Sequence, residues 1–279
     1  MSNKILLPEH LIDFRGYLLQ EEKSAATQEK YLRDVRAFLA FAGDREISKE
    51  VVLAYKSHLV ERNYAVRSIN SMLASINCLL EYMGWQDCKV KSMKQQRQVY
   101  CKEEKELSKE EYNRLLKAAE KKEQLHLVIQ TICSTGIRVS ELNYFTVEAL
   151  HQGEVIVRCK NKTRTVLLPK ALIRLLLRFA EKKKIQTGAI FVTRNGKPLD
   201  RSNIWAQMKS LCEEADVNPA KVFPHNLRKL FARTFYGIEK DIAKLADILG
   251  HGSIETTRIY IMTSGTEHRQ KIEQLGLVS

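Results

Sequence analysis

Several features that mark other classes of protein are missing from this sequence. No run of apolar residues approaches the roughly 18 that a membrane-spanning helix needs. The N-terminal segment MSNKILLPEHLIDFRGYL carries charges where a signal peptide needs its apolar core. There is no internal repeat and no low-complexity tract. We therefore expect a cytoplasmic protein that has no membrane partner.

Cysteine pairs at metal-binding spacing are also lacking. The six cysteines stand apart, without a CxxC pair or a Cys/His cluster at the spacing of zinc ligands. They are typical of buried thiols in a reducing compartment. The sequence therefore offers no metal site, and we predict that the protein uses no metal or other cofactor.

Acidic residues are too few to balance the basic ones. Lys and Arg number 46 against 33 Asp and Glu, which gives a formal net charge of +13 and a sequence pI near 9.4. Such a charge attracts polyanions, and each phosphate that a basic side chain neutralises adds affinity by releasing counterions. Nucleic acid is therefore the leading candidate partner, although a soluble protein with lysine-rich faces has the same composition.

The first part of the chain has the pattern of a helical domain. Its 279 residues are enough for two domains. Four stripes of apolar residues at helical spacing precede residue 84. Gly43 and Gly84 stand where helices are expected to end. We predict a four-helix domain over residues 1–86.

A basic, polar segment follows this domain. No acidic residue occurs from Cys88 to Lys102, while lysine, arginine and glutamine recur. We predict a linker over residues 87–105 that runs along a DNA backbone, and a solvated connector without DNA contact is the alternative. The DNA-binding side chains expected here are Lys89, Lys91, Lys94 and Arg97.

The remainder, residues 106–279, is predicted to form a mainly helical second domain with a small sheet. Ser108 and Glu111 have the spacing of a helix capping box. Glu154–Cys159 and Thr165–Leu168 have the β-branched composition of a hairpin. Besides a short strand at 189–192, we predict helices at 171–182, 203–214, 226–236, 241–249, 255–261 and 266–275.

Polar residues suited to holding a phosphodiester are spread over this second domain. A guanidinium group can hold two non-bridging phosphate oxygens. A phenol, whose free pKa is about 10, needs positive neighbours and a base before it can attack. The motifs TGIRVSEL, RCKNKTR, PHNLRKLF, LGHGSIETT and IY supply Arg138, Lys160, His225, Arg228, His251 and Tyr260.

These five motifs, in this order and at these separations, resemble the tyrosine recombinases, also called the phage integrase family. The resemblance covers the whole chain, and its most specific part runs from Ser134 to Ile261. It implies a mainly α protein, with a SAM-like core-binding domain before an α+β catalytic domain of the DNA breaking-rejoining type. In length the chain is similar to the compact, Xer-like members.

The resemblance also implies a role for each motif. Arg138 and Arg228 would clamp the scissile phosphate, and His251 would donate a hydrogen bond to a non-bridging oxygen. His225 would assist proton transfer near the attacking oxygen. Tyr260, nine residues after His251, would be the nucleophile.

Basic residues around the predicted hairpin complete the implied site. Lys160 would protonate the leaving 5′ oxygen, but the turn looks one residue shorter than the family's common form, and Lys162 competes for this role. Lys162, Arg164 and Lys229 are further candidates for DNA contact. Glu141 is expected either to orient a basic neighbour or to be an ordinary exposed glutamate.

The implied activity is site-specific recombination of double-stranded DNA through a 3′-phosphotyrosine, without metal or ATP. A homotetramer on paired sites would carry out integration, excision or resolution of a mobile element. The sequence does not say whether a partner recombinase or directionality factor is needed, nor whether the last helix docks on a neighbouring subunit. A catalytically silent DNA-binding regulator and strand relaxation like that of type IB topoisomerases are the alternatives.

Overall fold

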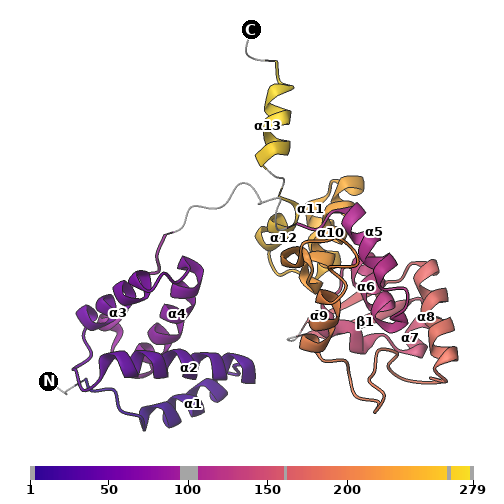
Figure 1. Ribbon diagram of the computed structural model, residues 1–279. Helices are drawn as coiled ribbons and strands as arrows, with labels where there is room; N and C mark the ends of the chain where they lie inside the picture. Colours follow the sequence, from indigo (N-terminus) through magenta and orange to yellow (C-terminus); the bar gives the residue numbers. More distant parts are fainter. Residues whose placement is uncertain (1–3, 95–105, 160–161, 263–264, 277–279) are drawn as a thin grey trace. The chain divides into compact units, whose positions relative to one another are not determined.

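The computed structural model describes residues 4–94, 106–159, 162–262 and 265–276 of the protein. The chain divides into two compact units, Met1–Arg97 and Gln98–Ser279. Figure 1 draws the first in indigo to purple and the second in magenta to yellow. No helix in the described ranges is long and apolar enough to cross a membrane.

The first unit consists of helices around one apolar core, which confirms the predicted four-helix arrangement. Phe14, Phe38 and Leu73 are fully buried in this core. Ser24 and Ser48 cap two of the helices, because each hydroxyl accepts a hydrogen bond from a backbone N–H in the first turn. The helices are α1 (His10–Gln20), α2 (Ala25–Ala42), α3 (Lys49–Glu61), α4 (Val66–Tyr82) and the short η1 (Gln86–Cys88).

The start of the predicted linker is fixed to α4 by two asparagines. Asn77 exchanges two hydrogen bonds with the backbone of Val90, at 2.9 and 3.1 Å. Asn70, seven residues earlier, does the same with Met93 at 3.0 and 2.7 Å. Residues 90–93 therefore pack on the first unit, and the rest of the predicted linker, from residue 95 to 105, lies outside the described residues.

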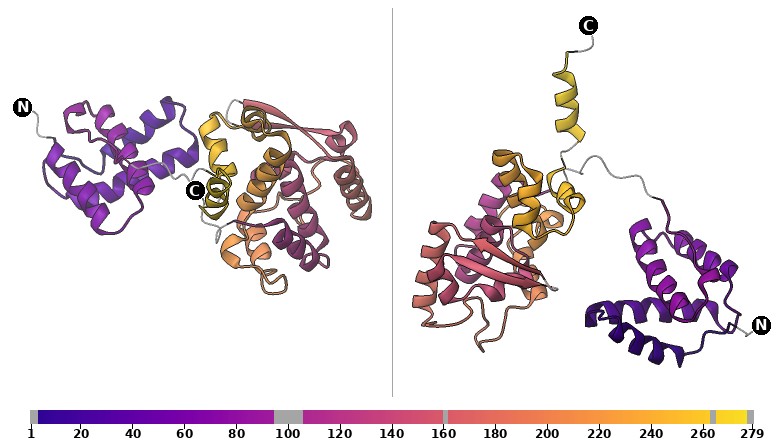
Figure 2. Two further views of the ribbon diagram at one scale, coloured as in Figure 1. Left: turned by 90° about the horizontal axis from the view of Figure 1, so that it is seen from above. Right: turned by 180° about the vertical axis from the view of Figure 1, so that it is seen from behind.

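The second unit is mainly helical with a two-stranded antiparallel sheet, as predicted. Figure 2 shows the two strands, in pink, along one face of this unit in its right-hand view. Its elements are α5 (Lys109–Ala118), α6 (Glu123–Thr135), η3 (Val139–Tyr144), α7 (Val147–Gln152), β1 (Glu154–Cys159), β2 (Lys162–Leu167), α8 (Lys170–Lys182), α9 (Arg201–Lys209), η4 (Pro219–Lys221), α10 (Pro224–Glu239), α11 (Ile242–Leu249), α12 (Ile254–Ile261) and α13 (Gly265–Glu273).

Helix α10 organises this unit. It packs against α6, α11 and α12, and these elements bring residues from distant parts of the chain together. Their apolar side chains form a main core and a smaller cluster in which Leu245, Leu249 and Tyr260 are buried. The motif residues of α10 and α12 are therefore held in place by packed apolar side chains.

Two local predictions are confirmed in this unit. The Ser108 hydroxyl accepts from the backbone N–H of Glu111 at 3.1 Å, and the Glu111 carboxylate accepts from the N–H of Ser108 at 2.8 Å, which completes the capping box. The hairpin also forms. Its second strand begins at Lys162, three residues before the predicted start, because the pairing register extends to Cys159 opposite Lys162.

Two other predictions are wrong. Residues 189–192 form no strand of their own, since Ala189 and Val192 make only isolated bridges, to Thr146 and Pro198. The predicted helix 203–214 is α9, which runs from 201 to 209. The chain turns after Lys209, although the following apolar residues are buried.

Candidate active site

Arg138 is placed by the turn that ends α6. The helix stops at Thr135, and Gly136 adopts a left-handed φ of 64°, where a Cβ would also clash with the ring of Phe231. Arg138 then caps η3, and 38 % of its side chain is exposed. Its guanidinium group is therefore anchored at the base and accessible at the tip.

Glu141 holds Arg138 in place through two hydrogen bonds. Its carboxylate accepts hydrogen bonds from the backbone N–H of Arg138 at 2.7 Å and from Nη1 of the same residue at 2.9 Å. Only 3 % of the Glu141 side chain is exposed. Of the two expectations for this glutamate, the one in which it orients a basic neighbour is confirmed.

Arg164 of β2 joins the same carboxylate. Its Nη2 lies 2.6 Å from Oε2 of Glu141, and its Nη1 donates to the carbonyl of Ile248 at 2.5 Å. Its side chain is 13 % exposed and passes so close to Gly250 that a Cβ there would lie 2.5 Å from Cδ of Arg164. The DNA contact predicted for Arg164 stays a prediction, while the structure shows its guanidinium connecting the hairpin to the C-terminal end of α11.

Arg228 is buried at the centre of the site. Pro224 stands at the first turn of α10, and Arg228 follows with 1 % exposure. Its guanidinium group donates to the carbonyls of Gly136 and Leu249, the latter at 2.6 Å. Burial, followed by the positive charge of Arg138, lowers the pKa of Arg228 to about 10. Its Nε is buried without a hydrogen-bond partner among the described residues.

His251 follows directly after the end of α11. The left-handed Gly250, with a φ of 63°, turns the chain so that the imidazole faces Arg228. Nε2 of the ring lies 3.0 Å from Nη2 of Arg228, and Nδ1 lies 2.8 Å from Oγ1 of Thr257. Burial and the neighbouring arginines, Arg228 first, lower the pKa of His251 to about 4. The ring is therefore neutral near neutral pH.

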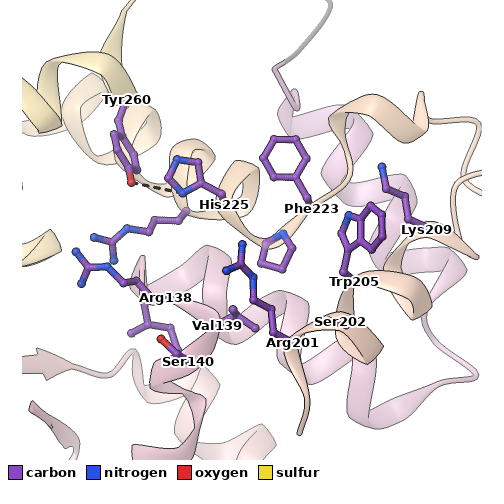
Figure 3. A pocket seen from close by; sticks show the side chains of 13 residues that line it. Arg138, Val139, Ser140, Arg201, Ser202, Trp205, Lys209, Phe223, His225 and Tyr260 are labelled. Atoms are coloured by element: carbon purple, nitrogen blue, oxygen red, sulfur yellow. Dashed lines mark hydrogen bonds between the residues drawn. The ribbon is translucent and has the colours of Figure 1, made fainter. Parts of the chain in front are cut away.

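Tyr260 lies between the two histidines. Its hydroxyl oxygen is 3.5 Å from Nδ1 of His225 (Figure 3), at the outer limit of a hydrogen bond. The ring centroids of His225 and His251 lie 5.0 and 4.9 Å from that of Tyr260. The guanidinium carbon of Arg228 lies 5.9 Å from the ring centroid of Tyr260. Tyr260 is 7 % exposed, so its hydroxyl is held within a cationic setting.

The pKa of His225 is also lowered. The first cause is partial withdrawal of the ring from water against Tyr260, and the second is the positive charge of Lys229 and Arg228. Although much of the residue remains exposed, its imidazole is thus favoured in the neutral form, which can accept a proton.

A cavity of about 660 Å³ opens beside these groups. Arg138, His225, Arg228 and Tyr260 line one side of it. Figure 3 shows that α9 supplies further basic and aromatic side chains, which the sequence analysis did not single out. These are Arg201, Trp205 and Lys209. Trp205 and Lys209 are four residues apart and therefore share one face of a helix, which is the sequence signal that could have found them. In the structure, Nζ of Lys209 lies 5.4 Å from the centroid of the Trp205 indole.

Two of the predicted basic side chains around the hairpin cannot be placed. Lys160 lies outside the described residues, and of Lys162 only the backbone, at the start of β2, is described. Lys229 lies 4.0 Å from the carboxylate of Glu106, which also pairs with Arg233. The assignment of the general acid between Lys160 and Lys162 therefore stays a prediction.

The basic residues predicted in the linker belong to the first unit where they are described. Lys89 pairs with Glu81 at 3.1 Å, while Lys91 and Lys94 are exposed, and Arg97 lies outside the described residues. Within the described ranges, no three His, Cys, Asp or Glu side chains gather where they could hold a metal ion.

Comparison with known proteins gives matches over both units. The model of the phage integrase family matches residues 105–266, and that of the phage integrase N-terminal SAM-like domain matches residues 11–87. The chain is 28 % identical to tyrosine recombinase XerA of Thermococcus kodakarensis over 276 residues, which cover 95 % of this chain and 94 % of that protein.

Solved structures with DNA share the fold. The XerH site-specific recombinase bound to a palindromic difH substrate, in a post-cleavage complex, aligns with a TM-score of 0.68 and 18 % identity, over 100 % of this chain and 91 % of that one. A lambda integrase tetramer bound to a Holliday junction aligns with a TM-score of 0.71 and 16 % identity, over 93 % and 78 %.

Proposed function

Since the chain belongs to the phage integrase family and is a tyrosine-type site-specific recombinase, we propose that it cuts and rejoins double-stranded DNA through a 3′-phosphotyrosine on Tyr260. The observation that carries the proposal is the convergence of four separate segments. The turn after α6, the start of α10, the turn after α11 and α12 bring Arg138, Arg228, His251 and Tyr260 together.

Tyr260 acts as the nucleophile. Its hydroxyl faces Nδ1 of His225, and the lowered pKa of His225 favours the neutral ring, which can accept a proton there. The distance of 3.5 Å is longer than a productive proton transfer needs, but such contacts often tighten only when substrate is bound. The phenolate oxygen then attacks phosphorus while His225 holds the proton.

Positive side chains hold the phosphate during this attack. Arg138, half-accessible at the cavity, grips non-bridging oxygens, and Arg228 together with His251 contacts the same group from its buried side. The two arginines are positioned by packing before the substrate arrives, so they stabilise the developing charge with little reorganisation of their own. The carbonyl contacts of Arg228 keep it aimed even when no phosphate is present.

The leaving group requires a proton. As the Tyr260–phosphorus bond forms, the bond from phosphorus to the 5′ oxygen breaks, and Lys160 gives that oxygen its proton. Attack by the 5′-hydroxyl of a second strand reverses the exchange and frees the tyrosine. Because the phosphodiester energy is kept in the phosphotyrosine, neither ATP nor a metal is consumed.

Recombination of two sites needs more than one copy of the protein. We assign residues 1–86 to core DNA binding and residues 106–279 to catalysis, with a homotetramer acting on two paired sites. The fold shared with the lambda integrase tetramer on a Holliday junction supports this assembly. Integration, excision and resolution all use the same two strand exchanges.

Covalent trapping tests the proposal. Nicked duplexes tiled from the DNA on either side of the gene are incubated with the wild type, Tyr260→Phe and Tyr236→Phe, and adducts are separated on a denaturing gel. Tyr236 is the matched control because it packs in the same apolar cluster as Tyr260. We expect an SDS-resistant adduct with the wild type and Tyr236→Phe and none with Tyr260→Phe.

The other outcomes point to different functions. Tight binding of a fragment without any adduct would favour a DNA-binding regulator. Relaxation of supercoiled plasmid by the monomer, without joining of two sites, would favour an activity like that of type IB topoisomerases. An adduct that survives Tyr260→Phe would assign the nucleophile to another residue.

A further inference from the structure

Thr257 is in direct contact with His251. It belongs to α12, has no exposed surface and places Oγ1 2.8 Å from Nδ1 of the imidazole. The sequence analysis quoted it within LGHGSIETT but gave it no role. A polar side chain buried against a histidine of the site has a hydrogen-bonding purpose, because an unpaired buried hydroxyl is unfavourable.

The position of the ring proton follows from Arg228. A guanidinium group can only donate, so the contact of 3.0 Å from Nη2 of Arg228 makes Nε2 of His251 an acceptor. The ring is neutral, since its pKa is lowered to about 4. Its one proton therefore resides on Nδ1 and is donated to the hydroxyl oxygen of Thr257.

This arrangement is the opposite of the one that catalysis needs. Non-bridging phosphate oxygens are acceptors, so His251 can stabilise them only with a proton on Nε2. A neutral ring with the proton on Nε2 has a lone pair on Nδ1, which needs a donor. The hydroxyl of Thr257 can supply one, because a hydroxyl both donates and accepts.

We propose that Thr257 is a positioning residue that supports both tautomers of His251. Its hydroxyl accepts from Nδ1 in the DNA-free protein, and it donates to Nδ1 once a phosphate oxygen replaces Arg228 as the partner of Nε2 and Nε2 becomes the donor. Water gives one proton to Nε2 and takes one from Nδ1, so the net charge of the ring is unchanged. The inference rests on the proposed function, in which His251 contacts the scissile phosphate.

The surroundings of His251 favour exchange between neutral forms over a lasting imidazolium. Positive groups face the ring from several elements, and each disfavours a second proton. They are Arg228 of α10, Arg138 before η3 and Arg164 of β2, while the titratable His225 of α10 also faces the ring and Tyr260 of α12 packs against it. With the charged form disfavoured, a partner that accommodates either neutral tautomer has a catalytic advantage.

Two substitutions separate hydrogen bonding from packing. Thr257→Val keeps the shape and loses the hydroxyl, whereas Thr257→Ser keeps the hydroxyl and loses a methyl group. In single-turnover adduct formation on the nicked duplex that the wild type cleaves, we expect Thr257→Val to be slower by on the order of 10-fold, the lower end of the effect of removing a partner that orients a metal-bound histidine. Thr257→Ser should stay close to the wild type, and the reverse order would overturn the proposal.

The tautomer itself provides the second measurement. Nitrogen NMR of histidine-labelled protein, with His251→Gln used to assign the signal, reports which ring nitrogen carries the proton. We expect the proton to be on Nδ1 of His251 in the DNA-free wild type and in Thr257→Ser. This measurement can be made even if Thr257→Val does not fold. A proton on Nε2 would overturn the role of Thr257 whatever the adduct result, whereas a wild type without adduct would count against the proposed function.

Discussion

Arg164 and the buried Glu141 form an ion pair, with Nη2 of the arginine 2.6 Å from Oε2 of the glutamate. The same carboxylate holds Arg138 at 2.9 Å. One acidic side chain therefore fixes two cations, one from the turn before η3 and one from the hairpin, and so links the hairpin to Arg138 at the cavity.

Removal of this carboxylate should destabilise the second unit. Glu141→Ala leaves the largely buried guanidinium of Arg164 without its carboxylate, and breaking a fully buried pair costs about 3–5 kcal/mol, which the 13 % exposure of the Arg164 side chain reduces. Urea unfolding followed by the fluorescence of Trp205, in a Trp85→Phe background that removes the other tryptophan, measures this loss. Glu239→Ala is the control, because its pair with Lys244 is exposed and should contribute about 0–1 kcal/mol. Equal losses for the two variants would contradict the account.

The salt dependence of DNA binding should distinguish Arg164 from a phosphate-contacting lysine. Lys91 is exposed in the basic segment, and we expect Lys91→Met to lower the slope of log affinity against log salt by about 1. Arg164→Met should leave the slope on a duplex of arbitrary sequence unchanged, because its guanidinium is occupied by Glu141 and the Ile248 carbonyl. A reduced slope with Arg164→Met would show that Arg164 reaches DNA.

Gly250 should tolerate no side chain. Gly250 and Gly196 both adopt left-handed φ values, of 63° and 70°, but only at Gly250 would a Cβ meet a neighbour, Cδ of Arg164 at 2.5 Å. Gly196→Ala should cost about 1–2 kcal/mol from its backbone conformation. Gly250→Ala should cost about 1–3 kcal/mol more from overpacking, and it should slow adduct formation because the turn carries His251. Similar values for both variants would exclude the steric contribution.

Stability should fall as pH drops from about 6.5 towards about 4. The pKa of His251 is lowered to about 4 in the folded protein, against about 6.5 in an unfolded chain. Between these values the unfolded state binds more protons, so acid favours unfolding. The resulting loss in the free energy of unfolding is smaller than about 3 kcal/mol, because solvent screens a ring that is only partly buried.

His251→Gln isolates this contribution. The variant should show a shallower decline of the free energy of unfolding across that pH range than the wild type. His151→Gln, at an exposed position of α7, should leave the decline as it is. An unchanged slope in His251→Gln would mean that the imidazole is not held neutral by its surroundings.

Local signals in the sequence predicted local structure well. The capping box at Ser108 and Glu111 needs only a four-residue segment, and it forms as predicted. The stripes of α1 to α4 likewise contain the residues that each helix buries, such as Phe14, Phe38 and Leu73, although Ile12 and Leu19 of the first stripe are exposed. The strand predicted at residues 189–192 does not form because no neighbouring strand among the described residues is available to pair with it. Ile190 and Phe191 are buried, but burial alone does not make a strand.

The candidate site depends on contacts that sequence spacing does not contain. Arg138 reaches the carbonyl of Gly250, 112 positions away, and the partner of Glu141 is an arginine on a strand 23 positions later. The sequence marks Arg164 only as one more basic residue near the hairpin, because its contacts with Glu141 and the Ile248 carbonyl cannot be seen in the spacing. Thr257 was missed for the same reason, since its importance comes from its distance to His251.

Mass spectrometry of the trapped adduct tests the central claim most directly. The adduct formed on a nicked duplex is digested with nuclease and protease, and the modified peptide is sequenced. The account predicts a nucleotide joined through its 3′ phosphate to Tyr260, together with a free 5′-hydroxyl on the released strand. A nucleotide on any other residue, or a link through a 5′ phosphate, would contradict it.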